Sequence, residues 1–316
     1  MKFSIGIPAY KATYLRECID SILSQTYINF ELIILNDASP ENVDEIVTFY
    51  TDSRIRYYVN EINIGAENVV DNWNRILELS KGEYIVMMGD DDMLMPRYFE
   101  EFNNLINKYP FLSIYHCRAK EIDENSRFRT ILYNYPERES VYDLMLNRLV
   151  RGRATFISDF VYKVSDLRNN GGFYKLPLAW ASDDVTSFIA ASKDGIAHTN
   201  SCIFCYRRHP TSITSSGSVL MKLQAIQLEK NWYKDFLDGC EPIGDEEEMV
   251  VKVLKRSWSN IIVKRQALAV GQVSRGRIIG VIFNVIRKRK KLNVRFKTIV
   301  YGLFIFIKQT AYGRYL

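Results

Sequence analysis

Short apolar runs and amphipathic stretches alternate along the first 96 residues. The apolar runs are nearly continuous, as strands buried on both faces are, whereas the stretches between them repeat apolar residues at helical spacing. The pattern predicts an α/β fold with a mostly parallel sheet covered by helices on both faces. The expected strands are Lys2–Pro8, Phe30–Leu35, Ile55–Val59 and Glu83–Met88, and the expected helices are Tyr14–Gln25, Asn42–Tyr50 and Ala66–Leu79, with Thr13 as the N-cap of the first.

The pattern is less regular after residue 96. Residues 97–215 mix predicted strands and helices, and from about Val219 the chain is predicted to be helical to its end. We therefore expect a domain over residues 1–215, with a first half at 1–96, and a helical extension over 216–316. The elements expected in the second half are helices at Tyr98–Lys108, Val141–Leu149 and Asp183–Ser192, strands at Leu112–Cys117 and Ile196–Arg207, a charged loop or hairpin at 119–138, and a turn at Gly171–Phe173.

Three consecutive carboxylates, Asp90–Asp92, follow the fourth apolar run. Right-handed crossovers place the loops after all four parallel strands at one edge of the sheet, where open α/β sheets bind ligands. Adjacent carboxylates repel one another and are best tolerated beside a cation, and hard oxygen ligands suit Mg²⁺ or Mn²⁺. A solvated acidic loop is the alternative, but such loops seldom follow so apolar a strand. The converging loops are Ala9–Lys11, Asn36–Ser39, Asn60–Gly65 and Gly89–Asp92.

Composition fits a globular protein. The chain has 316 residues, of which 47% are hydrophobic and 25% charged, enough for a sizeable core. The apolar run at the N-terminus is too short for a signal peptide, and the five cysteines are odd in number and scattered. We expect reduced thiols and a cytoplasmic location. Cys202 and Cys205 form a lone C-x-x-C pair, for which two thiols in an apolar strand is preferred to a zinc or redox site.

The charge is unevenly distributed. The net charge is +5, yet no acidic residue follows Glu248, and 16 of the 42 Lys and Arg residues lie in 249–316, leaving 26 bases against 37 acids before it. Five consecutive bases, Arg287–Lys291, separate two apolar segments that are too short to span a bilayer, Ile278–Ile286 and Ile299–Ile307. We expect this tail to lie on the inner face of an anionic membrane. A helical extension packed on the domain or on a dimer partner is the alternative; nucleic-acid binding is disfavoured by the acidic body.

Several short motifs follow one another along residues 1–215. They are Ser4–Tyr10, Glu31–Ser39, Asn63–Gly65, Asn72–Asn74, Lys81–Ile85, Asp90–Pro96, Gly171–Phe173, Asp183–Asp184 and Arg207–Ile213. By their order and spacing, residues 1–215 resemble the inverting glycosyltransferases of family 2, which have the GT-A fold. The resemblance implies a Rossmann-like GT-A domain whose residues 1–96 bind the nucleotide and whose residues 97–215 face the acceptor. It implies transfer of a sugar, from a nucleotide-diphosphate donor such as a UDP-sugar, to a glycan or lipid-linked hydroxyl in surface polysaccharide synthesis.

The resemblance assigns donor-binding roles to the strand-end loops. Asp37 would accept a hydrogen bond from the uracil N3–H group, although an Asx turn or N-cap before Pro40 is an alternative use of this side chain. The loop containing Asn63 and Gly65 would shape the nucleotide site or simply form a turn that opens a helix. The residues implied to contact the nucleotide are Pro8, Ala9, Tyr10, Asp37, Asn63, Gly65 and Asp90.

The acidic triplet matches the family's metal motif with one departure. Asp91 falls at the position of the metal ligand, Asp90 lies by the ribose or metal, and Asp92 holds the loop or binds through water. Gly89 occupies the place of the usual first aspartate, which puts coordination by two carboxylates in doubt unless Asp90 substitutes. The implied cofactor is Mn²⁺ or Mg²⁺, which would act as a Lewis acid on the diphosphate.

The resemblance also implies a catalytic base and a diphosphate loop. Asp184 matches the base that deprotonates the acceptor hydroxyl, with Asp183 as the alternative or as an acceptor contact; a role in capping the helix is the structural alternative for both. Trp180 precedes them on the acceptor side. Arg208 and His209 would offset phosphate charge, or belong to a solvated strand-end turn.

Two other functions remain open from the sequence. A nucleotidyltransferase would carry a Gly-rich basic loop after the first strand, which Pro8–Ala12 is not. A non-catalytic nucleotide-sugar-binding protein is suggested by Gly89. No nucleic-acid partner is expected, and the oligomeric state is open.

Overall fold

The structure, a computed structural model, describes residues 3–209, 218–273 and 275–312. Its first part contains four parallel strands in the order β3-β2-β1-β4. The predicted parallel pairing is therefore confirmed for this part. These strands are β1 (Phe3–Ala9), β2 (Phe30–Asn36), β3 (Ile55–Val59) and β4 (Tyr84–Met87), and the helices between them are α1 (Leu15–Leu23), α2 (Val43–Thr48) and α3 (Val69–Leu79), the last preceded by the 3₁₀ turn η1 (Ala66–Asn68).

The sheet as a whole is mixed. Among the described residues it has ten strands, and β9 lies between β4 and β6, antiparallel to both. β6 and β10 are parallel, whereas β5, β7 and β8 each pair in antiparallel fashion. The mostly parallel arrangement thus stops where short returning strands enter the sheet. The strands are β5 (Met93–Leu94), β6 (Ile114–Ile122), β7 (Phe128–Ile131), β8 (Arg138–Glu139), β9 (Phe160–Lys163) and β10 (Ile196–Arg207).

Helices cover both faces of the sheet. Successive side chains of a strand point to opposite faces, and β2 shows this directly: Leu32 and Ile34 join the core beneath α1 and α4, whereas Ile33 and Leu35 join the core beneath α3. Burial on both faces explains why these strands are apolar throughout. The remaining elements of this part are α4 (Tyr98–Lys108), α5 (Val141–Met145) with the π-helical turn η2 (Leu146–Val150), η3 (Ile157–Asp159), α6 (Val164–Asn169), η4 (Pro177–Ala179) and α7 (Ser182–Ala191).

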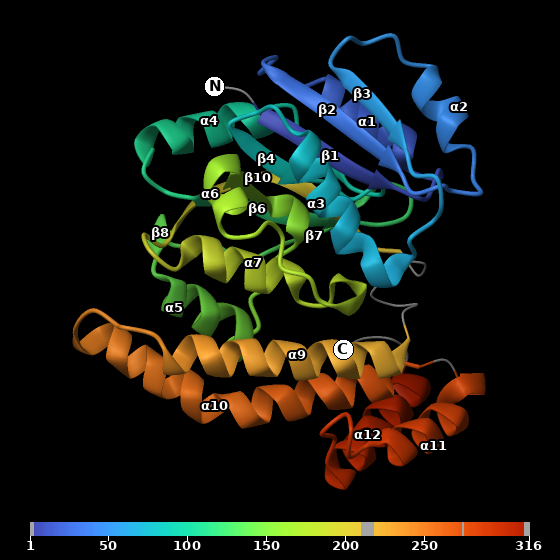
Figure 1. Cartoon of the computed structure of the whole chain (residues 1–316), viewed down its shortest axis with the longest axis vertical. Coiled ribbons are helices and arrows are strands. Elements are labelled where there is room, and N and C mark those ends of the chain that lie inside the picture. The colour runs from blue at the N-terminus through green and yellow to red at the C-terminus, as the bar shows by residue number, and fades with distance from the viewer. Residues whose placement is uncertain (1–2, 210–217, 274, 313–316) are drawn as a thin grey trace.

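The C-terminal extension is helical, as predicted. Two long helices, α9 (Val219–Asp238) and α10 (Gly244–Gly271), lie side by side beneath α5 and α7 (Figure 1), followed by the turn η5 (Arg275–Arg277) and by α11 (Ile278–Lys288) and α12 (Phe296–Tyr312). Tyr233 of α9 packs against Phe188 of α7. The extension is therefore joined to the helix that carries the Asp183–Asp184 pair. The predicted boundary at residue 215 falls outside the described residues.

Two local predictions differ from the structure, and one short strand was not predicted. Thr13 is not the N-cap of α1; Tyr14 is, and its side chain makes no capping hydrogen bond. The chain after the acidic triplet forms the short strand β5 before α4 begins, because Met93 and Leu94 pair with β10. The helix expected at Val141–Leu149 divides into α5 and η2.

Gly6 marks a close approach of β1 to α3, and its replacement by alanine is expected to destabilise the protein. A Cβ at Gly6 would lie 2.2 Å from Cγ2 of Ile76. Overpacking of this kind costs about 1–3 kcal/mol, measured as a lower free energy of unfolding in urea. Gly280→Ala is the matched control, because a Cβ there has no neighbour within 4 Å. Equal stability of both variants would contradict the packing described for β1 and α3.

Candidate active site

The loops that follow the parallel strands meet at one edge of the sheet, as predicted. Oδ2 of Asp90 accepts hydrogen bonds from the backbone N–H groups of Tyr10 at 2.9 Å and Lys11 at 2.8 Å, which ties the end of β4 to the end of β1. The Ser39 hydroxyl donates to the carbonyl oxygen of Tyr10 at 2.5 Å, which brings in the loop after β2. These contacts join the chain segments that follow β1, β2 and β4 at the candidate site.

Asp37 is buried and holds the loop after β3. Its Oδ1 accepts hydrogen bonds from Nδ2 of Asn60 at 2.7 Å and from the backbone N–H of Ile64 at 3.1 Å. Nδ2 of Asn63 donates to the Asp37 carbonyl oxygen at 3.0 Å. The Asx turn considered for Asp37 is not made; the N–H of Ser39 donates instead to Oδ1 of Asn36. Within the described residues no hydrogen bond is made to Oδ2 of Asp37, so the hydrogen-bonding capacity of that oxygen is unused.

The turn expected at Gly65 is present. Gly65 has φ of +80°, a conformation that glycine adopts without strain, and its carbonyl oxygen accepts from the N–H of Asn68 in the turn η1. The loop therefore forms the turn that opens a helix, which was the alternative to a role in shaping the nucleotide site. Its hydrogen bonds to Asp37 also hold it at the edge of the sheet that is predicted to receive the nucleotide.

The three aspartates point in three directions. Asp90 faces the end of β1, whereas Asp92 is buried between β10 and η3, with Oδ1 accepting from the N–H of Arg207 at 2.8 Å and Oδ2 lying 3.4 Å from the Ser158 hydroxyl. Asp91 keeps 22% of its side chain exposed, and its Oδ2 lies 2.6 Å from Nε2 of His209. Asp90 and Asp91 are thus the partly exposed members of the triplet, and Asp92 is the buried one.

Burial makes this acidic loop electrostatically costly. Burial, with the charge of Asp91 added to it, raises the pKa of Asp90 to about 6. Burial and the same neighbouring charge raise the pKa of Asp92 well above its usual value. Both shifts mean that full ionisation of the triplet is unfavourable without a counter-charge. A divalent cation next to Asp91 would supply that counter-charge.

Steric crowding explains why glycine stands at position 89. A Cβ at this position would lie 2.8 Å from Oδ1 of Asp91 and 3.0 Å from Oδ2 of Asp92. An aspartate at position 89 therefore does not fit beside the other two without moving them. The second protein donor next to Asp91 is the imidazole of His209, which sequence reasoning had placed near the diphosphate instead.

The donor set fits a weakly chelated divalent cation. A carboxylate oxygen and an imidazole nitrogen are both ligands that Mn²⁺ accepts, and Mg²⁺ in phosphate-transfer sites usually takes one or two protein carboxylates, with waters and substrate phosphates completing its shell. The described residues include no group of three or more His, Cys, Asp or Glu side chains arranged to hold a metal. Any cation here would depend on the diphosphate for further ligands.

Arg207 is a site residue that the sequence analysis missed. Its side chain is fully buried, with Nε donating to the carbonyl oxygen of Asp91 at 2.7 Å and Nη2 2.9 Å from Oε2 of Glu17. The alternation of β10 sends Arg207 inward and Arg208 outward, which is the signal that could have separated them. Arg208 forms an ion pair with Glu121 at 2.6 Å. The motif residues 210–213 lie outside the described residues.

Asp183 and Asp184 occupy different environments at the start of α7. Asp184 is 2% exposed, and its carboxylate lies 2.6 Å from Nε of Arg148 and 3.3 Å from Nη2 of Arg265. Burial opposes ionisation, but the two guanidinium charges hold the pKa of Asp184 below its usual value. Arg265 belongs to α10, so the extension contributes to this site. Arg265 also forms an ion pair with Glu229 of α9.

Asp183 is partly exposed, and its carboxylate accepts a hydrogen bond from the backbone N–H of Asp184. Burial and the adjacent charge of Asp184 raise its pKa to about 7. The N-cap of α7 is Ala181, whose side chain makes no capping hydrogen bond, and both aspartates lie in the first turn, where a carboxylate complements the helix dipole. Their positions therefore agree with the structural alternative considered from the sequence. Trp180, just before the helix, is partly buried beneath Lys222 of α9, whose Nζ lies 5.1 Å from the ring centroid.

One short segment, residues 155–158, connects the two acidic groups. The Thr155 hydroxyl lies 3.4 Å from Oδ1 of Asp184, and the Ser158 hydroxyl lies 3.4 Å from Oδ2 of Asp92. Ser158 also accepts from the N–H of Gly89 at 3.2 Å. The Asp183–Asp184 pair and the acidic triplet are therefore attached to opposite ends of the same four residues.

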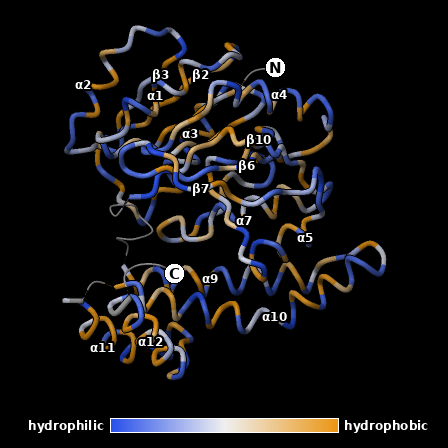
Figure 2. Tube along the Cα trace, turned by 180° about the vertical axis from the view of Figure 1, so that it is seen from behind, coloured by the Kyte–Doolittle hydropathy of each residue, from blue (hydrophilic) through white to orange (hydrophobic). Residues whose placement is uncertain are grey.

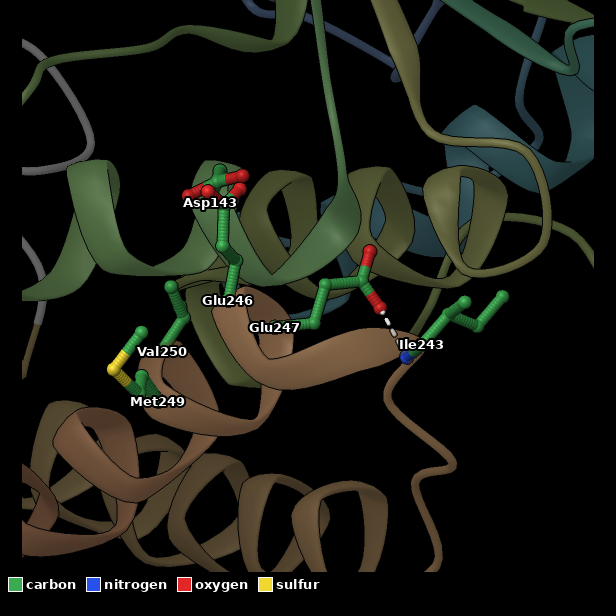
Figure 3. Close-up of a pocket in the computed structure, with 6 residues that line it drawn as sticks. All are labelled: Asp143, Ile243, Glu246, Glu247, Met249 and Val250. Carbon is green, nitrogen blue, oxygen red and sulfur yellow. Dashed lines mark hydrogen bonds between the residues drawn. The ribbon is translucent and has the colours of Figure 1, made fainter.

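A separate hollow of about 480 Å³ lies between α5 and the start of α10, and none of the predicted site residues lines it (Figure 3). Its wall is acidic, and Glu247 accepts a hydrogen bond from the N–H of Ile243 at 2.8 Å. A crowd of carboxylates would repel a diphosphate, so this hollow does not compete as the donor site. It is lined by Asp143, Ile243, Glu246, Glu247, Met249 and Val250.

Comparison with protein families and curated proteins gives a consistent result. Residues 4–164 match the model of glycosyl transferase family 2. An uncharacterized glycosyltransferase of Rickettsia typhi is 32% identical over 170 residues, which is 51% of each chain. The chondroitin synthase of Pasteurella multocida is 29% identical over 182 residues, 55% of this chain and 18% of that protein. The matches thus span about half or less of these relatives.

Two solved structures have a similar fold at low sequence identity. Residues 1–349 of Staphylococcus aureus TarS in complex with UDP-GlcNAc give a TM-score of 0.66 at 16% identity, covering 99% of this chain and 93% of that one. The mannosyltransferase PcManGT of Pyrobaculum calidifontis, in complex with GDP-Man and Mn²⁺, gives 0.55 at 12% identity, covering 99% and 88%. At these identities the similarity establishes the fold.

Proposed function

The chain belongs to glycosyltransferase family 2, and we propose that it transfers a sugar, with inversion, from a nucleotide-diphosphate donor to a hydroxyl of a glycan or lipid-linked acceptor. The observation that carries this proposal is the placement of two acidic groups at either end of residues 155–158. Asp91 with His209 lies at the strand-end edge, and Asp183 lies at the start of α7. The first can hold a leaving diphosphate and the second can activate an incoming alcohol.

The donor is proposed to be a UDP-sugar. Oδ2 of Asp37 would accept from the N3–H of uracil, while Oδ1 stays bonded to Asn60 and Ile64. Tyr10, 42% exposed at the end of β1, and Pro8 would flank the base, with Ala9 fixed by the hydrogen bond that its carbonyl oxygen accepts from the N–H of Asp37. TarS, which shares the fold, is described in complex with UDP-GlcNAc, which supports this choice.

Asp91 and His209 are proposed to hold Mn²⁺ or Mg²⁺ together with the donor diphosphate. A bound ion would neutralise the charge that develops on the leaving diphosphate. Asp90 would then keep the end of β1 in place through Tyr10 and Lys11, and Asp92 would anchor the loop to β10. Arg208, engaged by Glu121, is proposed to contribute only general positive charge near the phosphates.

We assign the base to Asp183 and a positioning role to Asp184. A general base works best when its pKa is close to the working pH, and the pKa of Asp183 is raised to about 7. Asp184 is nearly inaccessible and is neutralised by Arg148 and Arg265, which makes it a poor proton acceptor. Its ion pairs instead fix the start of α7, so that Asp183 and Trp180 face the acceptor.

The acceptor class rests on one named relative. Chondroitin synthase, which is similar in sequence, supports a glycan acceptor and a role in polysaccharide synthesis. Membership in this family favours sugar transfer over the nucleotidyltransferase alternative. Incubation with a panel of UDP-sugars and Mn²⁺ tests the proposal. Release of UDP supports it, and binding of UDP-sugar without turnover would favour the non-catalytic alternative.

Replacing Asp37 by asparagine is expected to weaken UDP binding about tenfold or more, because a hydrogen bond to a charged acceptor contributes about 1.5–3 kcal/mol. The amide oxygen would keep the loop contact, while the amide N–H₂ would oppose the N3–H of uracil. In CDP the N3 atom is an acceptor, so CDP is expected to lose little affinity or to gain some. Isothermal titration calorimetry with both nucleotides measures the change in preference. An equal loss for UDP and CDP would show that Asp37 only supports the loop.

A further inference from the structure

Two helices at the end of the chain carry regular stripes of exposed apolar side chains. On α11 the stripe consists of Ile279, Phe283 and Ile286, which are 84%, 66% and 40% exposed and spaced by four and three residues. Residues with that spacing share one face of a helix. The stripe of α12 follows the same rule and consists of Phe296, Val300, Phe304 and Ile307, with exposed fractions from 51% to 61%.

The two helices also bury apolar residues on their other sides. Val285 of α11 and Ile299 of α12 are almost fully buried in a cluster that includes Val270 of α10. Figure 2 shows α11 and α12 together at one end of the molecule, with apolar colour along both. The exposed stripes are therefore additional to the surface that packs these helices onto α10. Single exposed apolar residues are normal, but two periodic stripes on adjoining helices need a partner.

Charge identifies the chemistry of that partner. The exposed run Arg287–Lys291 joins the end of α11 to the loop before α12, and Arg295, Lys297 and Lys308 are also exposed. No acidic residue lies anywhere in 249–316. An occupant that is apolar in its interior and anionic at its rim matches both features, whereas a second copy of this basic surface would be repelled by it.

We propose that α11 and α12 form a docking surface for anionic phospholipid membranes. The stripe residues would enter the boundary between headgroups and acyl chains, and the basic run would contact lipid phosphates. Among the described residues, no helix combines the length and the apolarity needed to cross a bilayer, so the contact is with the surface. The proposal goes beyond sugar transfer and does not depend on it.

The docking surface is connected to α7, the helix that carries Asp183 and Asp184, through α10. α12 packs along α10, where Gly271 and Gly302 let the two helices approach so closely that a Cβ at Gly271 would lie 2.7 Å from the carbonyl oxygen of Gly302. α10 also carries Arg265, which pairs with Asp184. Docking of the extension would thereby hold the acceptor side of the enzyme next to a lipid-linked substrate.

Vesicle co-sedimentation of the full chain tests the proposal. Vesicles of phosphatidylcholine alone are compared with vesicles that contain about a third phosphatidylglycerol. We expect binding to the anionic vesicles that falls as salt is raised, and weak binding to the neutral ones. The variant Ile279→Glu/Phe283→Glu is expected to bind at least about tenfold more weakly. Arg289→Gln/Lys290→Gln is expected to show a smaller loss confined to the anionic vesicles.

Ile28→Glu/Phe49→Glu is the matched control. It changes the same residue types, exposed by 75% and 70% in the loop before β2 and at the end of α2, and it alters the net charge equally. Retained binding by this control with loss in the stripe variant supports the proposal. Equal binding by all variants, no binding to anionic vesicles, or self-association of the wild type that the stripe variant abolishes would overturn it. Because the readout is vesicle binding, failure of sugar transfer leaves the result intact.

Discussion

Replacing Asp183 by asparagine is expected to lower kcat by roughly a thousandfold, since a positioned general base contributes about 10²–10⁴. UDP binding should change little, because Asp183 is assigned to the acceptor rather than to the donor. The same change is expected to raise stability above pH 7. The pKa of Asp183 is raised to about 7 in the folded protein from an ordinary value of 3.8, so ionisation of this group destabilises the fold as pH rises between those values.

The pH dependence follows from the same shift. The base must be deprotonated to work, so kcat/KM of the wild type should rise with pH and level off above about 7. Steady-state rates between pH 5 and 9, with calorimetric melting of wild type and Asp183→Asn, give both readouts. Loss of turnover together with a gain in stability is the combination expected of a functional residue. If kcat/KM does not change with pH and Asp183→Asn melts at the same temperature as the wild type, Asp183 has no role in catalysis.

Asp184→Asn separates the two aspartates. It leaves Arg148 and Arg265 without their shared buried partner, and breaking a buried ion pair of this kind costs about 3–5 kcal/mol. Melting temperature should therefore fall, with a smaller drop in kcat. The pH profile of the molecules that remain folded should shift to lower pH, because the charge of Asp184 that helps to raise the pKa of Asp183 is removed. If Asp184→Asn instead removes turnover at unchanged stability while Asp183→Asn stays active, the assignment must be reversed.

Replacing Asp91 by alanine is expected to remove the metal dependence of donor binding and to lower kcat/KM at least about a hundredfold, because a Lewis-acid metal contributes several kcal/mol. Calorimetric titration of UDP with and without Mn²⁺ measures the first effect. His209→Ala should reduce the Mn²⁺ enhancement as well, since its Nε2 lies 2.6 Å from the Asp91 carboxylate.

Asp90→Asn is the matched control in the same triplet. An amide oxygen can still accept from the N–H groups of Tyr10 and Lys11, so the loop should stay in place and the Mn²⁺ enhancement should persist. If Asp90→Asn abolishes the Mn²⁺ enhancement and Asp91→Ala does not, the ion is held by Asp90. Asp90 would then act in place of the aspartate that is missing at position 89.

The sequence predicted the strand-end edge well because its elements are local. β3 and α4 have the predicted bounds, and the four loops meet where right-handed crossovers require. Antiparallel insertion of β9 between β4 and β6 was missed, since pairing between Tyr84 and Lys163 joins residues far apart in the chain. No short-range pattern encodes such a pairing.

The candidate site shows the same limit. The aspartates, Asp37 and His209 were found as motifs, but their separate roles depend on distant partners. Arg265 lies 81 residues after Asp184, on a helix of the extension. The sequence around Asp184 therefore does not predict the ion pair that helps to lower its pKa. Arg207 was overlooked because its neighbour Arg208 has the same chemistry, and the strand alternation that buries Arg207 was not applied to the pair.

The most direct test of the proposed site is a crystal structure of the full chain with UDP and Mn²⁺ bound. We predict uracil against Asp37, the ion held by Asp91 and His209 beside the diphosphate, and the carboxylate of Asp183 on the acceptor side of the donor. A nucleotide bound elsewhere, or an ion that reaches the phosphates without Asp91, would contradict the account.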